Sequence, residues 1–130
     1  MEAREIKQEV SIKAAPHEVY ECLMDSKKHS EVTGDTAIIS REVGGSFSAF
    51  SGYATGKNLE LVPDEKITQT WRASDWEEGH YSQITITLEE VDGATKLTFT
   101  QTGVPAEQYE DVSKGWYDYY WEPMKDYLEK

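Results

Sequence analysis

The sequence predicts an α+β fold, in which a curved antiparallel sheet of about six strands wraps around one long C-terminal helix and two short helices follow the first strand. Three observations predict it. Strand patterns joined by short turns follow one another from residue 36 to 103. Their alternation gives the sheet one apolar face and one polar face. A helix rich in aromatic residues closes the chain and is available to cover the apolar face.

The N-terminal third of the chain predicts one strand and two short helices. Ile6 and Val10 alternate with polar neighbours, as in a half-buried strand. Pro16 suits the first position of the helix that follows. Asp25 is a typical N-cap for a second helix, which Gly34 would end.

The middle of the chain predicts the rest of the sheet, with strands over 37–39, 46–50, 53–62, 67–73, 80–91 and 95–100. Asp92-Gly93 predicts a tight hairpin, and the short turns make neighbouring strands antiparallel. The inner, apolar face would carry Ile67, Trp71, Ile84, Ile86, Leu88, Leu97 and Phe99. Threonines suit the solvated outer face, which would carry Thr68, Thr70, Thr85, Thr87, Thr98 and Thr100.

The terminal helix has a wide apolar face. Of the chain's four Trp, eight Tyr and three Phe, six lie between Trp116 and Tyr127. At about 100° per residue, these side chains and their apolar neighbours cover an arc of roughly 200°, twice what an ordinary surface helix needs. We therefore expect the curved sheet to grip this helix, or the helix to face a cavity or a partner as well. Pro123 should kink the helix or disturb its last turns.

Length and charge narrow the classes of function. At 130 residues the chain is long enough for one domain with its own core, which we expect over residues 1–130. A net charge of -12 and a pI of about 4.6 make nucleic acid and anionic membranes poor partners. A basic protein surface is a compatible partner. Cys22 is the single cysteine, and neither a membrane-length apolar run nor a signal-peptide core occurs, so a cytoplasmic location is expected.

The histidines and the cysteine allow more than one interpretation. His80 is either a general base at a cavity mouth or, as the pattern favours, a hydrogen-bonded residue at a strand end. His17 lies four residues before Glu21, but two groups do not make a metal site, so a solvated pair is expected. His29 has no evident partner, and Cys22 is expected to be an inert apolar residue. Because no cofactor motif occurs, we expect no cofactor.

An acidic loop, Asp75-Trp76-Glu77-Glu78-Gly79, frames a tryptophan between two predicted strands. Trp is a frequent anchor of protein interfaces, so Trp76 could dock on a basic partner. The alternative is an ordinary polar hairpin tip with Trp76 folded back on the sheet.

Several short motifs, in the same order, resemble those of the activators of the 90-kDa heat-shock chaperone's ATPase. They are Gly44-Gly45-Ser46-Phe47, Trp71-Arg72, Trp76, Gly79-His80-Tyr81, Thr95-Lys96-Leu97, Gly103-Val104-Pro105, Gly115-Trp116, Tyr119-Tyr120 and Met124-Lys125. The chain is most similar to the C-terminal domain of these activators and its free-standing prokaryotic homologues. The eukaryotic activators carry an additional N-terminal domain, for which we expect no room in this chain. The resemblance implies the START-like helix-grip fold, shared by hydrophobic-ligand binders, polyketide cyclases and plant pollen-allergen proteins.

Three functions are expected. The first is a non-enzymatic binding domain of this family, which holds a small hydrophobic ligand between helix and sheet, a protein partner at the rim, or both. The resemblance implies the second, a co-chaperone that stimulates a 90-kDa heat-shock protein ATPase in the stress response. The third is a cyclase- or hydrolase-like enzyme that uses the cavity, although no catalytic residue is assigned. The ligand cavity would be lined by Phe47, Trp71, Ile84, Ile86, Trp116, Tyr120 and Met124, and the partner rim by Trp76, Glu77 and Trp121.

Overall fold

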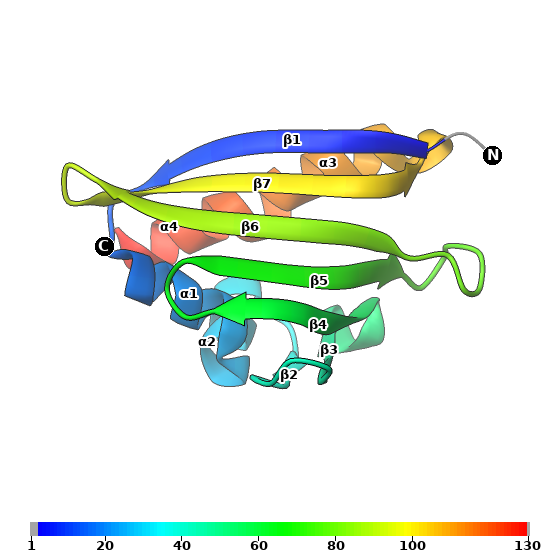
Figure 1. The fold of residues 1–130 in the computed structure, drawn as a ribbon, viewed down its shortest axis with the longest axis horizontal. Helices are drawn as coiled ribbons and strands as arrows, with labels where there is room; N and C mark the ends of the chain where they lie inside the picture. The colour runs from blue at the N-terminus through cyan, green and yellow to red at the C-terminus, as the bar shows by residue number, and fades with distance from the viewer. Residues whose placement is uncertain (1–2, 130) are drawn as a thin grey trace.

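A computed structural model describes residues 3–129. They form one antiparallel sheet, and the helices lie on one of its faces (Figure 1). The sheet has seven strands in the order β1-β7-β6-β5-β4-β3-β2. Their bounds are Ala3–Ile12 (β1), Ile38–Ile39 (β2), Ser46–Ala49 (β3), Ala54–Val62 (β4), Lys66–Ala73 (β5), Ser82–Val91 (β6) and Ala94–Pro105 (β7). The predicted strand order along the chain is confirmed, and the first strand completes the sheet by pairing with β7.

The two short helices lie where the sequence predicts them. The first, α1, spans Pro16–Met24 and has a proline in its first turn. The second, α2, spans Ser26–Thr33, and the side chain of Asp25 accepts a hydrogen bond from the amide of Lys28. Gly34 ends α2 with a φ of 77°, a left-handed conformation that glycine adopts without a side-chain clash.

The terminal helical run has four parts. These are the 3-10 turn η2 (Ala106–Gln108), α3 (Tyr109–Trp116), the π-helical turn η3 (Tyr117–Trp121) and α4 (Glu122–Leu128). Pro123 is predicted to kink the helix or disturb its last turns; the structure instead has a π turn just before the proline and regular α-helix from Glu122 to Leu128. A π turn adds one residue to the helical repeat, so the residues after it are rotated by one position on the wheel.

The inner face of the sheet and the aromatic side of the helix form the core. Every predicted inner-face residue from Ile67 to Phe99 is buried. The outer threonines are exposed or half-buried, apart from Thr68, which is buried. This is the helix-grip architecture. No helix within residues 3–129 is long and apolar enough to cross a membrane.

Strand β7 runs further than its alternating pattern predicts. The sequence predicts an end near Thr100, whereas pairing with β1 carries the strand on to Pro105, opposite Ala3. Gln101 therefore lies on the inner face and is fully buried. The extension brings the end of β7 beside the loop between β5 and β6, where His80 contacts Gly103.

Candidate functional site

A small internal cavity lies between the terminal helix and the sheet. Six of the seven residues predicted to line a ligand cavity line it: Phe47, Trp71, Ile84, Ile86, Trp116 and Tyr120. Met124 is fully buried in the core but does not line it. The cavity volume is about 20 Å³, which suffices for about one water molecule. The rings themselves fill most of the predicted space.

The polar wall of this cavity includes a histidine with two hydrogen-bond partners. His29 Nδ1 lies 3.2 Å from the carbonyl oxygen of Leu23, and Nε2 lies 3.2 Å from the hydroxyl of Tyr120. A neutral ring that donates from Nδ1 and accepts at Nε2 satisfies both. Burial lowers the pKa of His29, although the bond to Leu23 acts in the opposite direction. Burial also raises the pKa of Tyr120, so both groups are uncharged at neutral pH. Neither hydrogen-bond partner of His29 could be identified from the sequence around it.

Two buried glutamines hold the tryptophans of the terminal helix. The Trp116 indole donates to the side-chain oxygen of Gln101 at 2.8 Å, and the Trp121 indole donates to that of Gln8 at 2.7 Å. Gln8 in turn donates to the carbonyl oxygen of Ser113 at 2.9 Å, which ties β1 to α3. Sequence reasoning missed these glutamines, although both fall on inward positions of the strand alternation.

The prediction that Trp121 lies at a partner rim is wrong. Trp121 has no exposed surface, and its ring stacks on Trp116 with centroids 5.5 Å apart. The π turn is the physical reason. One extra residue in the turn rotates Trp121 from the edge of the apolar arc onto its centre, and it likewise brings Met124 to the position that a regular helix would give Pro123.

Trp76 is folded back on the sheet, so the ordinary hairpin-tip interpretation is the correct one. Only 5% of its surface is exposed, and its ring meets Trp71 edge-on at 5.3 Å. Its other neighbour is the ring of His80, at 5.5 Å. Glu77, next along the loop, is exposed. Of the three predicted rim residues, Glu77 is therefore the one at the surface.

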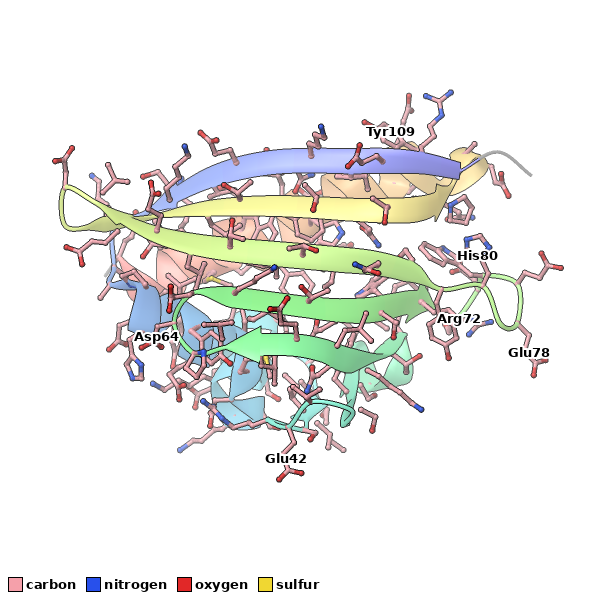
Figure 2. The ribbon with its side chains drawn as sticks, viewed as in Figure 1. Glu42, Asp64, Arg72, Glu78, His80 and Tyr109 are labelled. Atoms are coloured by element: carbon pink, nitrogen blue, oxygen red, sulfur yellow. The ribbon has the colours of Figure 1, made fainter. Side chains whose placement is uncertain are left out.

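The loop between β5 and β6 is pinned from both sides. His80 Nε2 lies 2.8 Å from the carbonyl oxygen of Gly103, so the hydrogen-bonded interpretation of this histidine is confirmed. The Arg72 guanidinium donates to the carbonyl oxygens of Trp76 and Glu77. Figure 2 shows Arg72, Glu78 and His80 together at this end of the molecule. Because Arg72 binds backbone carbonyls, the carboxylates of the loop keep their charge exposed.

Two buried indole N–H groups at this end have no acceptor within residues 3–129. They belong to Trp71 and Trp76. Buried donors are nearly always paired in folded proteins, so this pair of indoles marks the region as different from the rest of the core.

Two hollows open to the surface here. The first, the aromatic groove, has a volume of about 100 Å³ and is lined by Phe50, Tyr53, Trp71, Gln108, Asp111, Val112, Gly115, Trp116, Tyr119 and Tyr120. The second, the acidic hollow, has a volume of about 120 Å³ and is lined by Asp75, Trp76, Glu77, His80, Pro105, Glu107 and Gln108. Gln108 belongs to both. We call the two hollows and the loop 74–81 the loop end of the molecule.

The aromatic groove lies directly outside the internal cavity. Trp71, Trp116 and Tyr120 line both, so these three rings form the wall between them. Tyr53 and Tyr119 are 44% and 61% exposed and flank the groove at the surface. Sequence reasoning missed the groove because its walls come from three distant segments.

The remaining candidate residues do not converge on a reactive site. His17 pairs with Asp64 at 3.0 Å rather than with Glu21, which pairs with Arg41 at 2.6 Å, so the predicted partner is wrong. Both tertiary partners lie on other elements and are invisible to local spacing. Cys22 is buried, and burial raises the pKa of its thiol to about 11. No group of three metal-ligating side chains occurs within residues 3–129.

Comparisons with known proteins identify relatives over most of the chain. The family model described as "Activator of Hsp90 ATPase homolog 1-like protein" matches residues 13–129. The mouse protein named "Activator of 90 kDa heat shock protein ATPase homolog 1" is 33% identical over 111 residues, which cover 85% of this chain and 33% of the mouse protein. This chain thus spans about a third of the length of the curated relatives it matches.

Two solved structures share the fold. The crystal structure of an HSP90 activator from Plasmodium falciparum has a TM-score of 0.88 and 27% identity, and the match covers 98% of this chain and 96% of that one. The solution structure of the Aha1 dimer from Colwellia psychrerythraea has a TM-score of 0.84 at 21% identity, covering 97% and 96%. At 21% identity the second likeness speaks for the fold alone. On the family match and the identity together, this chain belongs to the family of Activator of Hsp90 ATPase homolog 1-like proteins.

Proposed function

We propose that this chain is a cytoplasmic, non-enzymatic protein-binding domain that docks on a chaperone of the 90-kDa heat-shock class through its loop end and stimulates its ATPase. The observation that carries the proposal is the contrast between a filled interior and an acidic, aromatic surface at one end of the molecule, where hydrogen bonds hold the loop backbone. The printed names of the relatives supply the class of partner.

The filled interior supports a protein partner over a small hydrophobic ligand. Sites for small molecules usually have volumes of roughly 300 Å³ or more, whereas the internal cavity has about 20 Å³. A ligand would have to displace Trp71, Trp116 or Tyr120, which pack on one another and on the sheet. Dense cores resist such rearrangement.

The bonded state of the reactive side chains supports a non-enzymatic role. His80 is held by a backbone carbonyl and by the edge of Trp76, and Cys22 is a buried thiol with a raised pKa. The Cys22 thiol is not the accessible, activated nucleophile that catalysis needs, and within residues 3–129 no carboxylate is hydrogen-bonded to His80 to activate it as a general base.

The rigid loop supports fast, charge-steered docking. Asp75, Glu77 and Glu78 are exposed on a loop whose backbone is held by Arg72 and His80. A preorganised surface loses little conformational entropy on binding. An acidic surface attracts a basic one over a distance set by the salt concentration.

The test is a pull-down and an ATPase assay with the host's chaperone of this class. We expect binding that weakens between low and high salt, and stimulation of the ATPase. The charge reversal Glu77→Lys should weaken binding by about tenfold, because it places a like charge against the basic partner. Glu42→Lys is the matched control, since it makes the same charge change on a different part of the surface (Figure 2). Equal effects of the two variants, or no binding by the wild type, would contradict the proposal.

A second measurement separates the ligand alternative. The wild-type protein is titrated with a fluorescent fatty-acid probe. The small cavity leads us to expect no saturable binding. Saturable binding that Trp116→Ala changes would favour a ligand between helix and sheet instead.

A further inference from the structure

The aromatic groove joins ring faces to negative charge that has no counter-ion. Asp111 lines the groove, and no ion pair joins Asp111 or Asp75 to another residue within 3–129. Burial raises the pKa of Tyr53, and the nearby charges of Asp75 and Asp111 raise it further. Both carboxylates are thus close enough to influence the rim of the groove.

Lys114 and Arg72, the cations next in sequence to the groove residues Gly115 and Trp71, are engaged elsewhere. Lys114, on the same helix, pairs with Asp118. Arg72 donates to the backbone of the loop. The groove therefore presents tyrosine and tryptophan rings beside carboxylates and leaves the positive partner to be supplied from outside.

Gly115 keeps the groove open. It lies within α3, where glycine weakens a helix relative to alanine. A Cβ at this position would contact only the ring of Tyr119, at 3.7 Å, which is an ordinary van der Waals distance. Core packing therefore does not require glycine here. Its effect is to leave space between Trp116 and Tyr119 in the wall of the groove.

Phe50 is held in the groove wall by an unusual backbone conformation. Its φ is 54° and that of Ser51 is 55°, both in the left-handed region that bulky residues rarely enter. In return its ring meets Tyr119 and Tyr120 edge-on at 5.9 and 5.4 Å. Local strain of this kind is concentrated at binding sites.

We infer that the aromatic groove binds the guanidinium group of an arginine in a basic segment of the partner protein, an inference that rests on the proposed function. A planar guanidinium stacks on aromatic faces and pairs with a carboxylate at the same time. The groove offers Tyr53 and Tyr119 for stacking and Asp111 for pairing. An anion would be repelled, and a neutral apolar group would bury Asp111 without a partner.

The acidic hollow extends the same chemistry along a peptide. It meets the aromatic groove at Gln108 and adds the carboxylates of Asp75, Glu77 and Glu107. A second basic residue close to the anchoring arginine in the segment would lie over these acids.

The first test compares two isosteres on the wild-type protein. Nα-acetyl-arginine methylamide and its neutral counterpart, Nα-acetyl-citrulline methylamide, are titrated while the indole N–H signals of Trp71 and Trp116 are followed by NMR. We expect saturable shifts with the arginine compound and at least about fivefold weaker binding of the citrulline compound, because only the arginine compound carries a positive charge. Equal affinities, or no shift with either compound, would overturn the inference.

The second test uses matched variants. Asp111→Asn should weaken arginine binding by at least about threefold through the lost charge pair, and Gly115→Ala should weaken it by narrowing the groove. Glu110→Gln is the control, because Glu110 shares the first turn of α3 with Asp111 but does not line the groove. If Glu110→Gln weakened binding as much as Asp111→Asn, general charge rather than the groove would explain it.

The chaperone assay separates this inference from the proposed function. If the wild type binds the chaperone and Asp111→Asn and Gly115→Ala bind it equally well, the groove does not hold an arginine of the chaperone and the inference is wrong, while the proposed function stands. If the wild type binds the arginine compound selectively but not the chaperone, the arginine chemistry of the groove stands and the proposed function fails.

Discussion

The four tryptophans divide the core into two regions of different character. Under β1 and β7, Trp116 and Trp121 each donate an indole hydrogen bond to a buried glutamine. At the loop end, Trp71 and Trp76 are just as buried, yet their indole N–H groups have no acceptor within residues 3–129. The first region ties the terminal helix to the sheet. In the second region, Trp71 lines the aromatic groove and Trp76 lines the acidic hollow; Trp116 of the first region also reaches the aromatic groove.

This difference between paired and unpaired indoles shows where side-chain hydrogen bonds stabilise the core and where they are absent within residues 3–129. A paired buried donor costs little, whereas an unpaired one costs about 1–3 kcal/mol of desolvation free energy. A protein can retain unpaired donors when the surrounding surface serves binding rather than stability.

The largest effect on the free energy of unfolding is expected from replacing Trp121 by alanine. Trp121→Ala should lower the free energy of unfolding by about 3–5 kcal/mol, because a fully buried ring and its hydrogen bond to Gln8 are both lost. Urea denaturation measures it. A loss below about 1 kcal/mol, typical of a surface position, would mean that Trp121 is not a core residue, and would contradict the comparison between the two pairs of tryptophans.

Replacing tryptophan by phenylalanine isolates the indole hydrogen bond. Trp121→Phe should cost about 1–3 kcal/mol more than Trp71→Phe, because only the former leaves the buried oxygen of Gln8 without a donor. Urea denaturation of both variants gives the difference. Adding Gln8→Leu to Trp121→Phe should recover only a part of the loss, since it removes the unpaired oxygen but also the hydrogen bond from Gln8 to Ser113. Equal losses of unfolding free energy in Trp121→Phe and Trp71→Phe would contradict the division of the tryptophans into two regions.

His29, in the wall of the internal cavity, should make stability depend on pH. Burial holds the pKa of His29 below its ordinary value of 6.5, so as the pH falls below 6.5 the unfolded chain takes up a proton that the folded protein does not. Stability therefore falls towards acid, by at most about 1.4 kcal/mol per pH unit from this group. His29→Gln should flatten the curve between pH 6.5 and the lowered pKa. Parallel curves for the two proteins would show that His29 is not the source.

The smallest expected effect is a gain in the free energy of unfolding. Gly115→Ala should raise the free energy of unfolding by about 0.5–1 kcal/mol, because alanine favours the helix and its Cβ meets no obstacle. Thermal unfolding measures it. The same variant should bind the arginine compound less well, so a gain in stability with unchanged binding would separate Gly115 from the groove.

Sequence patterns predicted most of the fold and only part of the site. Period-two alternation identified the inner residues from Ile67 to Phe99, since one face of the sheet must be apolar. Gln8 and Gln101 also face inward in the structure, but they were not predicted to do so: Gln101 lies beyond the predicted end of its strand, and the roles of both depend on indoles 113 and 15 residues away. Trp121 was misplaced because a regular helical wheel contains no π turn.

The sequence by itself determined the order of the elements, the two faces of the sheet and the aromatic character of the terminal helix. These follow from local periodicity, caps and turns, which act over a few residues. Only the tertiary structure decided that the interior is filled, which histidine pairs with which oxygen, and that Phe50, Tyr53, Asp111 and Tyr119 share one groove. Such contacts depend on how distant segments pack, and packing is set by the volume and direction of side chains that no local pattern encodes.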